Sequence, residues 1–480
     1  MLKQLLPIDR LALSLMLVLS VMIGVLVWGG EACGTNCLFR FGSPIQFSWQ
    51  NQEISAEDQA FILTFERPVD RESVEQNLAL EPVLPGKISW AGKRLAYTLE
   101  TPAPYGESYR VFLQGVKVAA NEETLPPFEG QFSTRDRAFA YIGSEAEEQG
   151  RLIFFNLTRK AKTILTPADL VVSDFQFYSQ GNKILFSAAP SDASNTLQSL
   201  RLYTVSMNEQ PQIELLLDNQ HYQNHQFEIT PDGQSVVVQR VNQQNPADFG
   251  LWLITPDREP RPLNISGGEF LIAPDGQTLA VAQGEGIGLF PLEPGAEPLN
   301  FLPQFGKVLN FSPDGSAAAM VNFNTNDPQR RYTRSLYYVT NQGEQKELLN
   351  IKGSIVDCQF APTSTALYCL LTELLEKEEY QEQPYFAKID LQTATIQPVF
   401  TLPDYQDIEV SLAPDGLGLL FDQIVTADIP MTDAPIADSG EAIVSSRLWM
   451  LILPAAHLSE NSQPQLEPLP LAGIRPQWMP

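Results

Sequence analysis

The sequence predicts an all-β protein with an N-terminal transmembrane helix, a small β-sandwich and a seven-bladed β-propeller. Three observations predict this fold class: an apolar run near the N-terminus, a set of short alternating segments after it, and a hairpin that recurs through the rest of the chain. With 480 residues, 44% of them hydrophobic, the chain is long enough for several domains. The predicted boundaries are 1–30 for a cytoplasmic tip and signal anchor, 31–50 for a linker, 51–134 for the sandwich and 135–480 for the propeller.

The N-terminal apolar run extends from Leu11 to Trp28 without a charged residue and follows Lys3 and Arg10. As a helix, a run of this length spans roughly 27 Å, close to the thickness of a hydrocarbon core. Basic residues before the run favour a cytoplasmic N-terminus. A cleaved signal peptide is the alternative, although its apolar region is usually only about 7–15 residues long. We therefore predict a single-pass cell-membrane protein with the bulk of its chain outside the cytoplasm, in the periplasm.

Five short segments with strand composition follow the anchor and its connector, and turn residues separate them. They are residues 60–66, 87–90, 94–99, 108–113 and 130–134. Several short strands in roughly 90 residues are typical of a β-sandwich. The segments Leu63–Asp70 and Pro104–Val111 resemble those of bacterial Ig-like domains related to S-layer proteins. This resemblance implies a spacer or adhesion module without chemistry of its own.

A Pro-Asp-Gly hairpin recurs along the remaining chain. Four copies stand at 229–238, 272–281, 311–320 and 412–421, with degenerate copies at 177–186 and 360–367. Steps of 39 to 52 residues separate the aligned positions, which suits a four-stranded unit. Proline cannot donate to a strand ladder and ends the incoming strand, whereas Asp-Gly supplies a tight turn in which glycine takes a positive φ.

The two ends of the repeat region complement each other. Residues 138–142, 151–157 and 162–165 have the composition of second, third and fourth strands, and Arg475–Pro480 has that of a first strand. We therefore predict that both ends close one composite blade, which removes the open sheet edges. With six internal units this gives seven blades. The repeats resemble the TolB-like, WD40-like (PD40 repeat) periplasmic propellers. Repeat scaffolds mostly serve recognition, so we rank a binding role above an enzymatic one.

Four cysteines stand in a compartment that we predict to be oxidising. Cys33 and Cys37 have a spacing that closes a small loop. If Phe360 pairs with Leu367 across its hairpin, Cys358 faces Cys369 directly. Such neighbours form either a disulfide or two ordinary buried side chains, and we favour the second because free cysteine is commonly buried.

Candidate chemistry is sparse. The three histidines, His221, His225 and His457, stand in no recognisable metal or catalytic motif, and nucleophile elbows and phosphate-binding glycine loops are absent from the sequence. The acidic residues of segment 426–446 match no calcium loop, and we interpret the segment as a solvated insertion. We interpret segment 373–382 as an exposed hairpin extension. The sequence thus predicts no catalytic, cofactor-binding or metal-binding residue and no cofactor.

The chain carries 57 acidic and 31 basic residues, a formal net charge of −26, which argues against nucleic-acid binding. We predict a membrane-anchored scaffold of the cell envelope that binds a protein or glycan partner through its propeller and is not an enzyme. Two alternatives stay open: an enzyme acting on an envelope polysaccharide from a site in the propeller channel, and a purely structural envelope component.

Overall fold

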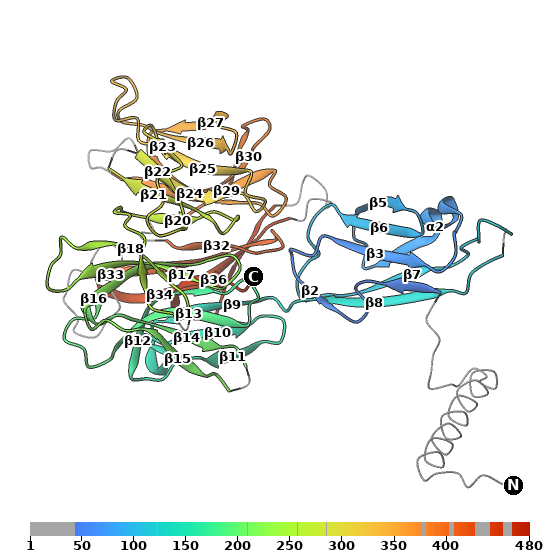
Figure 1. Cartoon of the computed structure of the whole chain (residues 1–480), viewed down its shortest axis with the longest axis horizontal. Coiled ribbons are helices and arrows are strands. Elements are labelled where there is room, and N and C mark those ends of the chain that lie inside the picture. Colours follow the sequence, from blue (N-terminus) through green and yellow to red (C-terminus); the bar gives the residue numbers. More distant parts are fainter. Residues whose placement is uncertain are drawn as a thin grey trace, which may run out of the picture.

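The computed structural model describes residues 44–121, 123–208, 210–256, 258–284, 286–375, 381–402, 408–427, 442–454 and 463–480. These residues form a two-sheet sandwich and, beside it, a ring of seven four-stranded sheets (Figure 1). The fold class needs one correction. No helix within the described ranges is long and apolar enough to cross a membrane, so the description becomes all-β with one short helix, without the transmembrane helix that we predicted. The apolar run at 11–28, Cys33 and Cys37 lie outside the described residues.

The sandwich contains two sheets of four strands each and one short helix. Its first sheet has the order β1 (Ile45–Phe47), β3 (Ala60–Phe65), β6 (Arg94–Leu99) and β5 (Gly86–Ala91). Its second sheet has the order β2 (Glu53–Ile54), β8 (Phe128–Thr134), β7 (Ser108–Leu113) and β4 (Leu78–Glu81). The helix is α2 (Arg71–Asn77). Alternate residues of facing strands, such as Phe61, Val111 and Phe132, pack into one core between the sheets. The sequence did not indicate β1, which lies within the range predicted as linker, or α2.

Each sheet of the ring is a blade, and the strands of every blade follow one another from the inner to the outer edge. Blade one contains β36 (Gly473–Trp478), β9 (Ala138–Gly143), β10 (Leu152–Asn156) and β11 (Ala161–Ile164). Blade two contains β12 (Leu170–Phe177), β13 (Lys183–Pro190), β14 (Arg201–Ser206) and β15 (Ile213–Leu217). Blade three contains β16 (Tyr222–Ile229), β17 (Val236–Asn242), β18 (Phe249–Ile254) and β19 (Arg261–Pro262). Blades four and five are β20 (Phe270–Ile272), β21 (Thr278–Gln283), β22 (Gly286–Pro291), β23 (Asn300–Leu302); and β24 (Lys307–Phe311), β25 (Ala317–Asn322), β26 (Arg334–Thr340), β27 (Gln345–Ile351). Blades six and seven are β28 (Ile355–Phe360), β29 (Ala366–Leu374), β30 (Glu382–Asp390), β31 (Ile396–Thr401); and β32 (Val410–Leu412), β33 (Gly418–Ala427), β34 (Ala442–Ile452), β35 (Gln465–Pro468).

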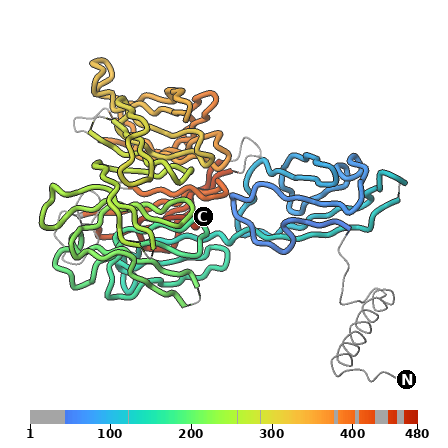
Figure 2. Tube along the Cα trace, in the orientation of Figure 1, coloured from blue at the N-terminus to red at the C-terminus, as the bar shows by residue number. Residues whose placement is uncertain are grey.

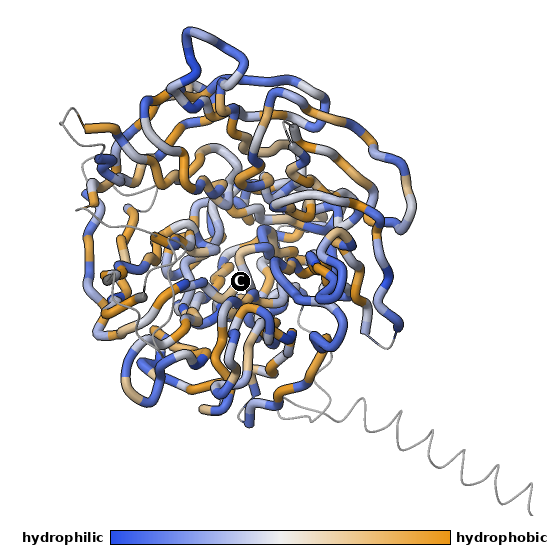
Figure 3. The backbone as a smooth tube through the Cα atoms, turned by 90° about the vertical axis from the view of Figure 1, so that its left-hand side faces the viewer, coloured by the Kyte–Doolittle hydropathy of each residue, from blue (hydrophilic) through white to orange (hydrophobic). Residues whose placement is uncertain are grey.

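The repeated hairpin joins the inner strand of a blade to its second strand. The turn glycines Gly233, Gly276, Gly315 and Gly416 all have φ between 65° and 73°, the left-handed region that glycine enters without steric cost. Seen from the side away from the sandwich, the sheets form a roughly circular outline with apolar segments within it (Figure 3). Apolar side chains of neighbouring blades pack together in shared clusters, as Leu309 of blade five does with Phe360 of blade six. The strand pairing thus agrees with the four-stranded units that the repeat predicted.

The ring closes through both ends of the described chain. Strand β36 pairs antiparallel with β9, so that Ile474 faces Ile142 and Trp478 faces Phe139. Figure 2 shows the red C-terminal segment beside the first strands of the propeller. This composite first blade is the closure that the sequence predicted, and it leaves no blade with an unpaired edge at the seam.

Blade six contains a disulfide. Phe360 faces Leu367 and Cys358 faces Cys369, the register that the hairpin predicted. The two cysteines are bonded to each other, so our preference for two free buried side chains was wrong. Both side chains lie in an apolar cluster between blades five and six, where a bonded pair contributes no free thiol to the core.

The sandwich contacts the propeller at the hairpin of blade seven. In that hairpin Asp415 is buried, and its Oδ2 accepts a hydrogen bond from the backbone N–H of Tyr105 in the sandwich at 3.0 Å. The same oxygen accepts from Nη2 of Arg137 at 2.7 Å. Gly106, next to Tyr105, has φ +81° and lies so close to Thr158 of blade one that a Cβ would meet Oγ1 at 2.8 Å. A glycine is therefore required at this contact.

The other copies of this aspartate only close their own turns. Oδ1 of Asp314, for example, accepts hydrogen bonds from the hydroxyls of Ser312 and Ser316, and hydrogen bonding from Ser312 is the main cause of its lowered pKa. Asp415 also accepts locally from the N–H of Leu417, but its second oxygen is committed to the sandwich contact. One copy of a repeated turn residue has thereby become an interdomain contact.

We expect Asp415→Ala to destabilise the contact between sandwich and propeller by about 3 kcal/mol, because it leaves the Arg137 guanidinium and the Tyr105 N–H without their buried acceptor. The matched control is Asp314→Ala, for which we expect about 1 kcal/mol or less. Thermal unfolding and limited proteolysis of the 135–137 junction measure both effects. Equal behaviour of the two variants would contradict the assignment.

Candidate channel site

The seven inner strands border a central channel with two different ends. Every blade begins with its inner strand, so these strands run in the same direction along the channel. We call the end that carries the Pro-Asp-Gly turns and contacts the sandwich the hairpin face. The opposite end carries the starts of the inner strands and the connections between second and third strands, and we call it the loop face. A ligand that enters from the loop face does not meet the sandwich.

Side chains of the inner strands form a hydrogen-bonded belt around the channel. The residue three positions before each aligned turn proline is polar in six blades: Gln176, Glu228, Asn310, Gln359, Ser411 and Gln477. Five of them accept a hydrogen bond from a backbone N–H of the next blade, at 2.7 to 3.4 Å: those of Ile229, Ile272, Phe360, Leu412 and Trp478. Gln477 instead donates to the carbonyl of Phe175 at 2.9 Å. The belt therefore ties each of these blades to its neighbour.

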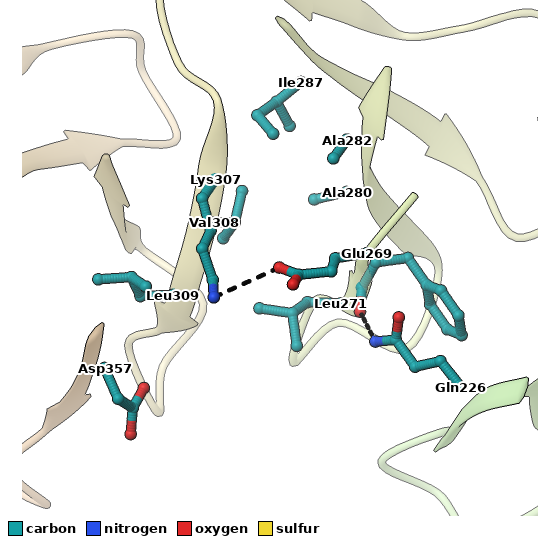
Figure 4. A pocket seen from close by; sticks show the side chains of 11 residues that line it. Gln226, Glu269, Leu271, Ala280, Ala282, Ile287, Lys307, Val308, Leu309 and Asp357 are labelled. Atoms are coloured by element: carbon teal, nitrogen blue, oxygen red, sulfur yellow. Dashed lines mark hydrogen bonds and ion pairs between the residues drawn. The ribbon is translucent and has the colours of Figure 1, made fainter. Parts of the chain in front are cut away.

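The belt is interrupted in blade four, where Leu271 occupies the equivalent position and offers no acceptor. A pocket of about 190 Å³ lies at this interruption, between the inner strands of blades four and five (Figure 4). Its apolar wall includes Ala280, Ala282, Ile287 and Leu309, and its polar residues are Gln226, Glu269, Lys307 and Asp357. Replacement of one polar belt residue by leucine thus coincides with the hollow in the channel wall.

The polar residues of the pocket come from four successive blades. Nζ of Lys307 lies 3.4 Å from Oε2 of Glu269, and both side chains are substantially exposed. Oδ2 of Asp357 accepts a hydrogen bond from Nε2 of Gln359 at 2.8 Å, and burial raises the pKa of Asp357. Nε2 of Gln226 donates to the carbonyl of Phe270 at 2.9 Å. Glu269 directly precedes β20 and Lys307 is the first residue of β24, so the charged rim lies toward the loop face.

Burial also raises the pKa values of two further carboxyls, those of Glu228 and Asp422. Glu228, a belt residue, has its pKa raised to about 8, because burial disfavours its charged form more than the bond from the Ile272 N–H favours it. Asp422 of β33 accepts the N–H groups of Glu409 and Arg475, each at 2.8 Å, and burial raises its pKa to about 6. Asp422 thus holds the start of the closing strand β36.

The candidates named from sequence do not converge on a site. His225 lies on β16 and is exposed, and His221 lies just before that strand, also exposed. The residues that lie outside the described ranges are His457, the acidic residues of 428–441, and residues 376–380 of segment 373–382. Within the described ranges no group of three or more histidine, cysteine, aspartate or glutamate side chains could hold a metal ion. The pocket was not anticipated, although the apolar Leu271 at an otherwise polar repeat position was a visible sign of it.

Comparisons with known proteins found no matching family model and no matching curated protein. Among solved structures, TolB from Acinetobacter baumannii is 11% identical and has a TM-score of 0.41, over 84% of this chain and 83% of that one. An oligogalacturonate lyase from Vibrio parahaemolyticus is 11% identical with a TM-score of 0.45, over 60% of this chain and 88% of that one. A putative 6-phosphogluconolactonase from Bacteroides fragilis is 14% identical with a TM-score of 0.44, over 72% and 97%. The relation of the sandwich to Ig-like domains stays a prediction.

We expect Glu228→Gln to reduce the pH dependence of stability. With a pKa raised from 4.5 to about 8 on folding, Glu228 holds a proton in the folded state that the unfolded chain releases. The contribution of Glu228 to the free energy of unfolding is therefore fully present below about pH 4.5. It is lost as the pH rises toward 8, by up to about 1.4 kcal/mol per pH unit.

Glutamine is the natural belt residue of blades two and six and keeps the acceptor for the Ile272 N–H. In urea unfolding between pH 5 and 8, the free energy of unfolding of Glu228→Gln should rise relative to that of the native protein as the pH increases. Glu344→Gln, at an exposed turn of blade five, serves as the control and should leave the slope unchanged. Parallel curves for native protein and Glu228→Gln would contradict the shifted pKa.

Proposed function

We propose that this protein is a recognition module of the cell envelope, and that it binds a protein partner through the loop face of its propeller. The observation that carries this proposal is the distribution of exposed apolar side chains. Of the thirteen large hydrophobic residues exposed among the described residues, eight lie at the loop face: Leu197, Phe249, Phe323, Tyr332, Val356, Leu374, Val425 and Val444. The eight residues belong to five blades, and a face that carries most of the exposed apolar side chains is a candidate interaction surface.

The lengths of the connections also favour the loop face as the binding surface, because its connections are longer than those of the hairpin face. At the hairpin face the first two strands of most blades are joined by tight turns, and the sandwich covers part of that face. At the loop face the second and third strands of blades two, three and five are joined by residues 191–200, 243–248 and 323–333. Tyr332 is 75% exposed there, with the guanidinium of Arg331 4.6 Å from its ring centroid. Aromatic and arginine side chains of this kind are enriched in protein interfaces.

An enzyme that acts on an envelope polysaccharide is less well supported. Pockets for small-molecule substrates usually have volumes of about 300–1,000 Å³, whereas the channel pocket measures about 190 Å³. Its rim carboxylate, Glu269, is paired with Lys307. Negative charge along the channel would also repel an acidic polysaccharide.

The partner can be located by photo-crosslinking in intact cells. We expect a crosslinking amino acid at Tyr332 or Phe249 to capture one defined protein, and the same amino acid at Leu215 or Ile396, exposed on outer strands, to capture none. Equal capture from both pairs of positions would contradict a loop-face site. No capture from any position would favour the purely structural component, and release of oligosaccharides from purified envelope material would favour the enzyme.

We also propose that the propeller resides in an oxidising compartment outside the cytoplasm. The Cys358–Cys369 disulfide supports this location, because such bonds rarely persist in a reducing cytosol. We expect both cysteines to resist alkylation in protein taken from cells without reductant, and to react after reduction. Exchange of both for serine should cost about 2–3 kcal/mol of stability, given a loop of 11 residues. Full alkylation before reduction would contradict the location.

A further inference from the structure

The channel pocket combines an apolar wall with a charged rim. Ala280, Ala282 and Ile287 form part of the wall, and Glu269 and Asp357 bring carboxyls from blades four and six. Figure 4 shows the Lys307 side chain lying beside the hollow, with its amino group directed to the Glu269 carboxylate. An aliphatic stem that ends in a cation would match both parts of this surface.

The size of the pocket suits one side chain. A cavity of about 150 Å³ accommodates a benzene molecule, so about 190 Å³ holds only a few more non-hydrogen atoms. A sugar chain needs more room than this, because pockets that bury whole ligands are larger. The pocket therefore fits an anchor side chain, of the kind that buried interface centres commonly receive.

The charge along the channel favours a positive end group. Over the seven inner strands and the residue that precedes each, two residues are basic, Lys307 and Arg475, and five acidic residues carry the opposite charge: Asp169, Asp174, Glu269, Asp357 and Glu409. Glu228 also lies there, but with a pKa of about 8 it holds its proton at neutral pH. The whole chain has a net charge of −26, which points the same way. Such a field attracts cations toward the loop face and repels anions.

We propose that the channel pocket receives a lysine or arginine side chain of the protein partner, and that Lys307 occupies the cation position until the partner binds. This inference rests on the proposed function and specifies the partner's chemistry. The stem of the incoming residue lies against Ala280, Ala282 and Ile287, and its cation takes the place of the Lys307 ammonium beside Glu269. Asp357 adds a second carboxyl to the pocket lining, from blade six. Lys307, whose side chain is 36% exposed, then turns into the solvent.

Substitution of Lys307 distinguishes this mechanism from anion binding. If Lys307 competes with an incoming cation for Glu269, Lys307→Gln strengthens binding of a basic ligand. If Lys307 itself were the anchor for an anionic ligand, the same substitution would abolish binding. Lys307→Gln therefore raises the affinity in the first case and lowers it in the second.

The experiment is a titration of the full-length protein with capped pentapeptides that carry one lysine, arginine, norleucine or glutamate between glycine and serine residues. The methyl signals of Ile287, Ala280 and Ala282 in NMR spectra report occupation of the pocket. We expect shifts with the lysine or arginine peptide and not with the norleucine or glutamate peptide. We expect Kd to rise about threefold to fivefold for Glu269→Gln, about tenfold for Asp357→Asn, and to fall about threefold for Lys307→Gln.

The control is Glu344→Gln, which removes one negative charge as Glu269→Gln does. Glu344 lies on an exposed turn far from the channel, so this substitution should leave Kd unchanged. Ala282→Leu fills the hollow without a change of charge and should abolish the shifts. An unchanged thermal midpoint shows that each variant is folded. The inference is overturned if the glutamate peptide binds as well as the lysine peptide, if Lys307→Gln weakens binding of the basic peptides, or if no peptide shifts the pocket methyl signals.

Failure of this inference can be told from failure of the proposed function. The crosslinker at Tyr332 is introduced into protein carrying Ala282→Leu and into protein without it. Loss of the captured partner in the filled variant supports the pocket as its anchor. Undiminished capture would show a loop-face partner that does not use the pocket, so only the further inference would fail. Absence of capture from both proteins would overturn the proposed function itself.

Discussion

The antiparallel pairing of β36 with β9 joins the last described strand of the chain to a strand more than three hundred residues earlier. Other contacts exist only because this seam is closed. The backbone N–H of Trp478 donates a hydrogen bond to the hydroxyl of Ser411, and the side chain of Gln477 donates to a carbonyl of blade two. The backbone N–H of Arg475 donates to the buried carboxyl of Asp422. The carbonyl of Pro480 accepts from Arg135 at the junction with the sandwich. The belt, the channel and the position of the sandwich therefore depend on a contact between strands that are far apart in the sequence, which is entropically costly to close.

Within the ring, individual departures from the repeat carry the features that distinguish one blade from another. The turn aspartate is local in blade five, but as Asp415 in blade seven it binds the sandwich. The belt position is polar in six blades, but as Leu271 in blade four it accompanies the pocket. A repeat scaffold tolerates such changes because most of its stability comes from contacts within a blade and with its immediate neighbours.

Much of the propeller could be predicted because a strong local rule, proline followed by Asp-Gly, marks every well-formed hairpin and sets the register of the strands beside it. The Cys358–Cys369 register followed from one such hairpin. Bond formation did not follow, since register places two sulfur atoms side by side without deciding between thiols and a disulfide. The Asp415 contact, the Glu269–Lys307 pair and the pocket join residues of different units. The partners of these residues are set by packing between blades, which no local pattern encodes. Helix α2 was not predicted because seven residues are too few to show a helical period.

The two faces of the propeller therefore have different physical roles. The hairpin face has short turns, and its buried Asp415 accepts one hydrogen bond from Tyr105 of the sandwich and one from Arg137 at the junction, which favours a fixed relative position. The loop face has longer connections, most of the exposed apolar side chains, and the charged rim of the pocket. In the proposed complex the partner meets a channel wall whose blades are joined by the belt hydrogen bonds, beside the longer connections of blades two, three and five. Under the proposed function, the channel pocket fixes the position of one anchor residue, and buried anchors of this kind carry most of the energy of an interface.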